Sequence, residues 1–280
     1  MTRLQYTVTV VALDRARLHG YTVPVCDLVE ATRARGHAVV LPDGQTVPDV
    51  RLVKGRHLRP GARYESTGSD PGERVTTVLR EWRRVDVLAL EQFVRSPEFG
   101  ARIAVRLRCP ERPAALDVEA RIRGAEGSGA LHRLRGKASL DLRAWWAAAS
   151  AAPGTPSAAR APATVRLTHR LGVARLYLRP RPAGPDRWDV DVTLTLHGRS
   201  LLRPVAGLAL LLARVPLRRG FRTSVEEAAR QWNEALGRVL AHDPDEFRAE
   251  LASYMVRRPK ADGPAPQAEE KSAGPDGTVG

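Results

Sequence analysis

The sequence has very few residues of four types, and the scarcity of cysteine is the most informative. Its 280 residues include two cysteines, two methionines, two isoleucines and one asparagine. The two thiols, Cys26 and Cys109, are too few for a disulfide framework in a chain of this length. The first residues alternate polar and apolar side chains without a cleavable apolar core, and no segment approaches the roughly 20 apolar residues that span a bilayer. We therefore expect a cytoplasmic protein.

Sequence motifs for catalysis are also missing. We find no G-x-S-x-G elbow, no H-E-x-x-H pair, no P-loop and no dinucleotide fingerprint. The seven histidines are scattered. Asp189 and Asp191 resemble an acidic metal-binding pair, but they lie on a strand whose neighbouring side chains are typical of a solvated face. We therefore expect no metal and no cofactor, and the sequence leaves open whether the protein is an enzyme.

Basic residues are abundant, and nearly all of them are arginine. Of the 45 basic residues, 41 are Arg and 4 are Lys, and the formal net charge is +14. The excess of Arg, Ala, Gly and Pro is typical of a high-GC genome, so codon usage explains part of it. The remaining imbalance favours anionic partners in general. Nucleic acid is not favoured, because the chain has no zinc-finger spacing, no RRM-like motif and no lysine-rich arm.

Most of the chain has the two-residue periodicity of strands. The segment 187–197 is the clearest, with Trp188, Val190 and Val192 on one face and Asp189 and Asp191 on the other. The other predicted strands are 3–13, 74–81, 84–94, 101–108, 116–123, 130–142 and 163–178. Successive strands with short connections predict an antiparallel meander. We expect an α+β fold with a strongly curved antiparallel sheet, or an open or near-closed barrel, packed against long C-terminal helices.

The N-terminal third predicts one helix and one hairpin. Pro24–Arg35 is expected to be helical, with Gly36 as its stop. Segments 37–41 and 47–53 flank a turn sequence and predict a hairpin. An alternative for residues 33–40 is the helix-to-strand step of a Rossmann-like unit, although no glycine-rich loop precedes it.

Two helices are predicted near the C-terminus. Thr223 with Glu226, and Ser224 with Glu227, each offer a capping box at the start of a helix. The apolar positions that follow form one helical face: Val225, Ala228, Ala229, Trp232, Ala235, Leu236, Val239 and Leu240. A second helix is expected to begin at Asp243-Pro244 and to carry Phe247, Leu251 and Met255 on its apolar stripe.

The segment Leu201–Leu217 allows two interpretations. Its apolar run, Val205–Ala213, has nine residues and fits a helix buried against the sheet, with Pro216 breaking or kinking it. The alternative is reversible docking on an anionic membrane surface. The arginines that would make that contact are Arg203, Arg214, Arg218, Arg219 and Arg222.

Composition divides the chain into a folded body and a tail. Residues 1–258 are expected to form a single α+β domain, with a sub-boundary near residue 70 and a mobile Ala/Pro/Ser-rich loop at 147–163. Residues 259–280 contain no aromatic residue and are expected to be disordered. Trp145-Trp146, just before the loop, is interpreted as packing at the sheet edge, with the mouth of a ligand pocket as an alternative.

The C-terminal part resembles a known superfamily. The strand Trp188–His197, the link Gly198–Pro204 and the helix around Gln231-Trp232-Asn233 are similar to the helix-grip, or START/polyketide-cyclase-like (SRPBCC), superfamily over residues 163–256. The resemblance implies a curved sheet wrapped around a C-terminal helix, with a cavity for an apolar ligand. It implies no catalytic residue, because the superfamily shares none. A lipocalin-like barrel with a terminal helix is the nearest alternative.

These observations favour a protein that binds an apolar small molecule or lipid between the sheet and the C-terminal helix. Trp232, on the apolar face of that helix, is a candidate ligand contact. His169 and Tyr177 are further candidates, because they are titratable groups in an otherwise apolar predicted strand. The alternatives are a polyketide-cyclase-like enzyme on the same scaffold, which would use these two residues, and a basic peripheral protein on anionic membranes.

Overall fold

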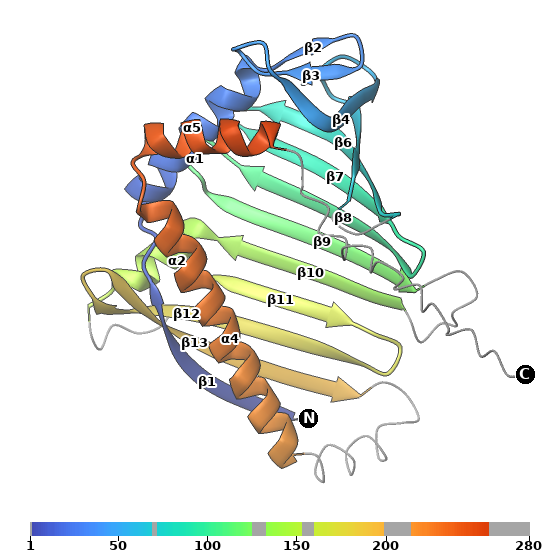
Figure 1. Cartoon of the computed structure of the whole chain (residues 1–280). Coiled ribbons are helices and arrows are strands. Elements are labelled where there is room, and N and C mark those ends of the chain that lie inside the picture. Colours follow the sequence, from blue (N-terminus) through green and yellow to red (C-terminus); the bar gives the residue numbers. More distant parts are fainter. Residues whose placement is uncertain (1, 69–71, 125–132, 153–159, 199–213, 258–280) are drawn as a thin grey trace, which may run out of the picture.

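The protein has an α+β fold in which one large antiparallel sheet carries helices on one face (Figure 1). The computed structural model describes residues 2–68, 72–124, 133–152, 160–198 and 214–257. The first strands are β1 (Thr2–Val11), β2 (Arg33–Arg35), β3 (Ala38–Val40), β4 (Thr46–Lys54), β5 (Arg63–Thr67), β6 (Arg74–Arg83) and β7 (Val87–Arg95). The others are β8 (Phe99–Arg108), β9 (Ala115–Gly124), β10 (Arg133–Asp141), β11 (Ala163–Thr168), β12 (Gly172–Gly184) and β13 (Arg187–Gly198). The helices are α1 (Arg15–Ala31), α2 (Leu142–Ala149), α4 (Arg214–Leu240) and α5 (Pro244–Val256).

The strand order explains why the sheet is curved. Twelve of the 13 strands follow one another from β2 to β13, and β1 is added beyond β13. Because β1 and β2 lie at opposite ends of the sheet, α1 must carry the chain from one end to the other. Twelve strand spacings of about 4.8 Å would separate the ends of a flat sheet by roughly 58 Å. A helix of 17 residues and its short links reach only about 40 Å. The sheet therefore has to curl, as predicted.

The strands do not close into a barrel. Among the described residues, β1 pairs only with β13 and β2 only with β3, so both are ends of an open sheet. The lipocalin-like alternative is therefore wrong. β5 and β6, on either side of residue 70, pair with each other within this one sheet.

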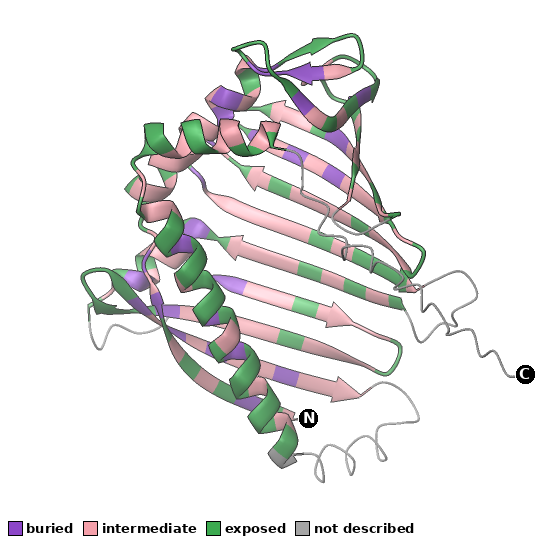
Figure 2. Cartoon of the chain, in the orientation of Figure 1, coloured by how far each residue is buried: buried purple, intermediate pink, exposed green. Residues whose placement is uncertain are grey.

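The sheet has two chemically different faces. On the inner face, which the helices cover, apolar side chains occupy every second position of β8 to β13. On the outer face the alternate positions carry mostly arginine, threonine and acidic residues. Figure 2 shows that the central strands are largely half-buried, while fully buried residues gather toward the helices. The predicted alternation along 187–197 is confirmed in β13, where Trp188, Val190 and Val192 are buried.

Helix α4 begins earlier than predicted. Its first residue is Arg214, so Thr223 and Ser224 lie inside the helix and do not cap it. Pro216 lies in the first helical turn, where its missing N–H has no helical partner to lose, so it does not break the helix. The expectation for α5 is confirmed, because the Asp243 side chain accepts from the Glu246 amide and the Glu246 carboxylate accepts from the Asp243 amide.

Helix α1 also differs from the prediction. It begins at Arg15, where the Asp14 side chain caps it, and Pro24 lies in its interior. It ends at Ala31, and residues 33–40 form the antiparallel hairpin of β2 and β3, with Gly36 at its turn at φ +60°. The Rossmann-like alternative is therefore wrong. The hairpin that follows is confirmed as β3 and β4.

Three further expectations needed correction. The segment 163–178 is two strands, β11 and β12, joined by a tight turn. Strand β5 was not predicted. The first three residues of the expected loop 147–163 belong to helix α2, because the Asp141 side chain accepts from the Ala144 amide and so caps it. The remainder of that loop at 153–159, the segment Leu201–Ala213 and the tail 259–280 lie outside the described residues.

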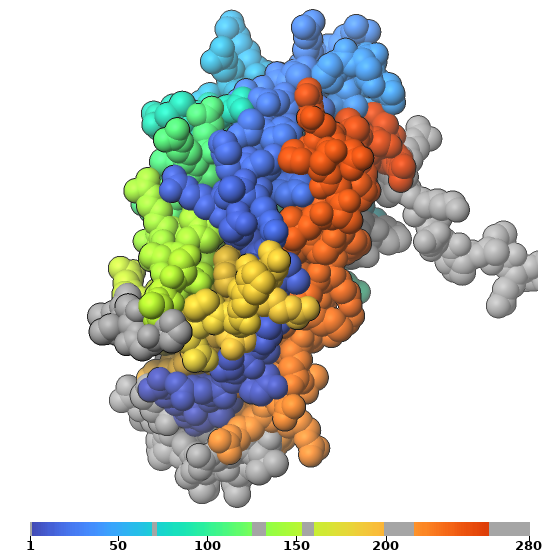
Figure 3. Space-filling view, turned by 90° about the vertical axis from the view of Figure 1, so that its left-hand side faces the viewer, coloured from blue at the N-terminus to red at the C-terminus, as the bar shows by residue number. Residues whose placement is uncertain are grey.

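The end of the sheet formed by β2 to β6 has an aliphatic core, and we call it the packed end. Leu28 of α1 lies with Val39, Leu41 and Val47, and α5 packs on this cluster through Leu251 and Met255. A neighbouring cluster contains Leu52, Ala62 and Leu79. Figure 3 shows α1 and α5 side by side over this region, and the Tyr21 and Phe247 rings join them edge to face at 5.3 Å.

Candidate functional site

The opposite end of the sheet, formed by β1, β13, β12 and β11, contains an apolar cavity under α4 and α2. We call this the cavity end. The cavity has a volume of about 460 Å³ and lies between the inner face of the sheet and the two helices. Its lining comprises the apolar residues Val8, Val10, Leu13, Leu18, Leu140, Leu142, Trp145, Trp146, Ala163, Leu176, Leu178, Trp188, Val190, Val192, Phe221, Val225, Ala228, Ala229 and Trp232, together with Ser224.

Four of the five tryptophans in the chain line this cavity. Trp145 and Trp146 come from α2, Trp188 from β13 and Trp232 from α4. The rings of Trp145 and Trp188 meet edge to face with centroids 6.0 Å apart. The indole N–H of Trp146 donates to the Leu13 carbonyl at 3.0 Å, so its polar group is satisfied and its ring is left as an apolar wall.

Helix α4 is fixed above the cavity through the free edge of β1. Trp232 donates its indole N–H to the Val11 carbonyl at 3.0 Å. Asn233 accepts from the Val11 amide at 2.7 Å and donates to the Thr9 carbonyl at 3.4 Å. Because β1 ends the sheet, these backbone groups have no strand partner on that side. The side chains of α4 therefore replace a missing strand and set the height of the helix above the sheet.

A second contact holds the N-terminal half of α4 against β1. The Tyr6 hydroxyl donates to the Glu226 carboxylate, which also pairs with Arg222 at 2.8 Å, and the Arg222 guanidinium lies 5.3 Å from the Tyr6 ring centroid. The hydrogen bond to Glu226 raises the pKa of Tyr6, and the same bond lowers the pKa of Glu226. The capping role predicted for Glu226 is thus replaced by a role in attaching the helix to the sheet.

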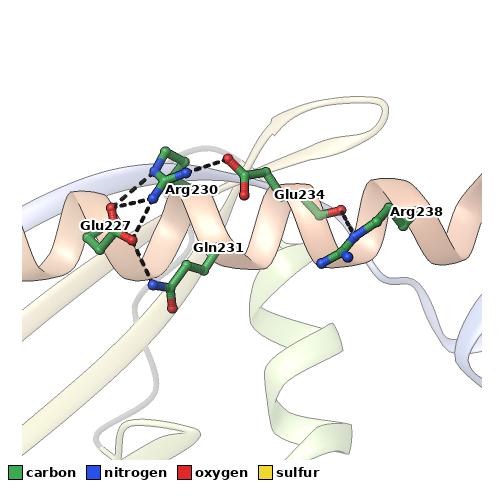
Figure 4. A network of polar contacts seen from close by, with 5 residues as sticks. All are labelled: Glu227, Arg230, Gln231, Glu234 and Arg238. Carbon is green, nitrogen blue, oxygen red and sulfur yellow. Dashed lines mark hydrogen bonds and ion pairs between the residues drawn. The ribbon is translucent and has the colours of Figure 1, made fainter. Parts of the chain in front are cut away.

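The outward side of α4 is occupied by contacts within the helix. Figure 4 shows Arg230 between Glu227 and Glu234, with Gln231 donating to Glu227 and Arg238 donating to the Glu234 backbone. The Arg230 guanidinium lowers the pKa of Glu227 through its hydrogen bonds. These polar groups are satisfied on the solvent side, so only the apolar face of the helix is directed at the cavity.

The structure places the three predicted ligand contacts at different sites. Trp232 lines the cavity and is 42% exposed, so it forms the part of the wall that solvent reaches. Tyr177 lies on β12 between Leu176 and Leu178, which line the cavity, and alternation puts Tyr177 on the outer face. His169 lies in the turn between β11 and β12, where its ring nitrogen accepts from the Leu171 amide at 3.3 Å.

The sequence predicts no helix at Trp145 and Trp146 and places the pair at the sheet edge. They belong to α2, and their rings reach the cavity because the helix folds back over β12 and β10. The available signal was Asp141, a good helix N-cap residue, followed by an alanine-rich segment. Packing at the sheet edge does not describe the position of this pair, because both rings line the cavity.

The predicted membrane-contact arginines fall in and before α4. Arg203 lies outside the described residues, and Arg214 is the first residue of the helix. Arg218 and Arg219 are exposed and form no ion pair with another described residue, whereas Arg222 pairs with Glu226. In the part of the chain that the structure describes, no helix is both long and apolar enough to cross a membrane. Association with anionic membranes stays a prediction.

The described residues contain no cluster of side chains suited to bind a metal ion. No group of three or more His, Cys, Asp and Glu side chains there could hold an ion. Asp189 and Asp191 lie on the outer face of β13, where Thr9 donates to Asp189 at 2.7 Å and Thr7 donates to Asp191 at 2.7 Å.

Comparisons with known proteins give little. No protein-family model matches the sequence, and no curated protein matches it. A structural match is found with the crystal structure of the di-domain ARO/CYC StfQ from the steffimycin biosynthetic pathway, at 13% identity and a TM-score of 0.21, covering 89% of this chain and 99% of that one. A similarity this low carries no argument about this protein.

Proposed function

We propose that the protein binds an apolar small molecule or lipid in the tryptophan-lined cavity between the sheet and α4. The observation that carries the proposal is an apolar space of about 460 Å³ bounded by four indole rings. Ligand sites are typically concave spaces of about 300–1,000 Å³ with mainly hydrophobic and aromatic walls. The space lies between sheet and C-terminal helix, where the superfamily resemblance implies a ligand.

The chemistry of the walls favours binding over catalysis. The described residues that line the cavity include no carboxylate, histidine, lysine or thiol, and Ser224 supplies the one hydroxyl. The indole N–H groups of Trp146 and Trp232 are already committed to backbone carbonyls. What the walls offer a ligand is apolar contact, worth about 25 cal/mol for each Å² of apolar surface removed from water. A hydrocarbon or aromatic ligand fits these walls better than a polar one.

A fluorescence titration tests the proposal. The neutral apolar dye N-phenyl-1-naphthylamine should bind the protein saturably and quench its tryptophan fluorescence. Ala229 lines the cavity on α4, so Ala229→Phe should fill part of the space and weaken binding at least tenfold. Ala235, on the same helix, is exposed and does not line the cavity, so Ala235→Phe is the matched control and should leave the affinity within about twofold. Equal affinity in both variants would show that the dye binds elsewhere, and the proposal would be wrong.

A further inference from the structure

The outer face of the sheet is rich in arginine, and several of its basic side chains on β8 to β10 pair with carboxylates of other strands. Arg106 pairs with Glu81 at 3.1 Å and Arg108 with Asp117 at 3.0 Å. Lys137 pairs with Glu119 at 2.8 Å. Each pair links two strands of the sheet and compensates the charge of its basic member.

Two arginines on β11 and β12 have no carboxylate partner among the described residues. Arg166 on β11 lies directly opposite Arg175 on β12, so two like charges occupy a cross-strand pair. Neither guanidinium forms a hydrogen bond or ion pair with another described residue. On the other side of Arg166 the register partner is Lys137, whose charge is compensated by Glu119. Like charges in directly opposed positions destabilise a sheet, so an anion at this position would stabilise the fold.

These two arginines border a hollow of about 470 Å³ on the same face. Two more arginines, Arg160 and Arg179, lie on its wall, and the hydroxyl-bearing residues Thr164 and Tyr177 stand opposite each other in register. No acidic residue is among the described residues that line it. The wall therefore presents hydrogen-bond donors around a space with positive potential. Tyr177, which does not line the apolar cavity, lines this hollow.

We propose that this hollow binds a phosphate-bearing ligand, with Arg166 and Arg175 as its principal contacts. Guanidinium groups recognise phosphate oxygens through paired N–H donors, which a single ammonium cannot do. The Thr164 and Tyr177 hydroxyls supply further donors on the wall. The site lies on the opposite face of the sheet from the apolar cavity and does not depend on the function proposed for it.

Calorimetric titration with pyrophosphate tests the proposal on the full chain. The double variant Arg166→Gln/Arg175→Gln should weaken binding at least tenfold. The control is Arg106→Gln/Arg108→Gln, which removes the same charge from the same face at arginines that already have carboxylate partners. It should weaken binding by less than about threefold. Equal losses in the two variants would mean diffuse attraction to a basic surface, and no loss in either would mean binding elsewhere. Both results would overturn the proposal.

A thermal unfolding measurement guards against a folding defect. Pyrophosphate should raise the Tm of the unmodified protein and leave that of the double variant unchanged, because only binding to the native state stabilises it. Without ligand the Tm of the double variant should be no lower than that of the unmodified protein.

Phosphatidylcholine vesicles with and without phosphatidic acid separate a free phosphate ester from a lipid headgroup as the source of the phosphate. If the protein sediments with the acidic vesicles, if pyrophosphate reverses this, and if the double variant does not sediment, the phosphate is that of a lipid headgroup. Pyrophosphate binding without sedimentation assigns a soluble ester.

Discussion

The two ends of the sheet use the same layers of helix on strand but are filled by different side chains. At the cavity end the buried cluster combines Trp188 with the small residues Ala12, Ala149 and Ala229 and with four valines. At the packed end it consists of branched or flexible side chains such as Leu28 and Val47. Rigid rings beside alanines hold the layers apart without filling the space between them, whereas aliphatic chains interdigitate. The difference indicates that the cavity follows from the choice of side chains and that the layers themselves do not require it.

Adding the same side chain at each end should produce the largest difference. Ala62 is 0% exposed and packs with Leu52 and Leu79, so Ala62→Leu should overpack the site and lower the free energy of unfolding by about 1–3 kcal/mol. Ala229 borders the cavity, and leucine is nearly as good a helix former as alanine. We expect Ala229→Leu to be neutral or stabilising. Urea denaturation measures both, and an equal cost at the two positions would mean that side chains cannot use the cavity.

A smaller difference should come from removing one hydroxyl at each end. The Tyr64 hydroxyl accepts from the Leu58 amide at 2.9 Å and lies 3.0 Å from His57 Nδ1, in a partly buried position at the packed end. Tyr64→Phe leaves that amide without its partner and should cost about 1–2 kcal/mol. At the cavity end the Tyr6 hydroxyl donates to exposed Glu226, where water can replace it. The same urea measurement on Tyr6→Phe should show no resolvable change, and an equal loss there would remove this distinction between the ends.

Much of the fold was predictable because most strands have one solvent-exposed face, which gives their sequences a two-residue alternation of polar and apolar side chains. The alternation in β13 and the Asp243-Pro244 start of α5 are local signals, and both were interpreted correctly. The start of α1 was missed because Pro24 is a strong local argument against a helix interior, and the packing of α1 on α5 overrides it. Strand β5 was missed because three of its five residues, starting with Arg63, are exposed and carry no periodic apolar signal.

The candidate site was predicted only in its position between the sheet and the C-terminal helix. Trp232 could be recognised from the helical periodicity of its neighbours. The face of Tyr177 could not, because the segment 163–178 was treated as one strand and the turn at residues 169–171 changes which side chains face inward. The contribution of α2 depends on a helix folding back over the sheet, and that is a long-range contact with no local pattern.

The smallest expected effect is a dependence of stability on pH at the packed end. His57 lies between the Thr32 hydroxyl, 2.9 Å from Nε2, and the Tyr64 hydroxyl. Burial lowers the pKa of His57, and a hydrogen bond with Thr32 acts in the opposite direction. The unfolded chain therefore takes up the proton at a higher pH than the folded chain. The contribution to stability is complete above the ordinary histidine pKa of about 6.5, falls as the pH is lowered through the folded pKa, and is constant below it.

Urea denaturation between pH 7.5 and pH 5 should show this as a difference between the protein and His57→Gln. The unmodified protein should lose slightly more stability than the variant on acidification, because glutamine does not titrate. Since the other titratable groups are common to both proteins, their contributions cancel in the difference. Parallel pH profiles would show that the ring takes up its proton without cost, and that the packed end encloses His57 less tightly than it encloses Leu28 and Val47.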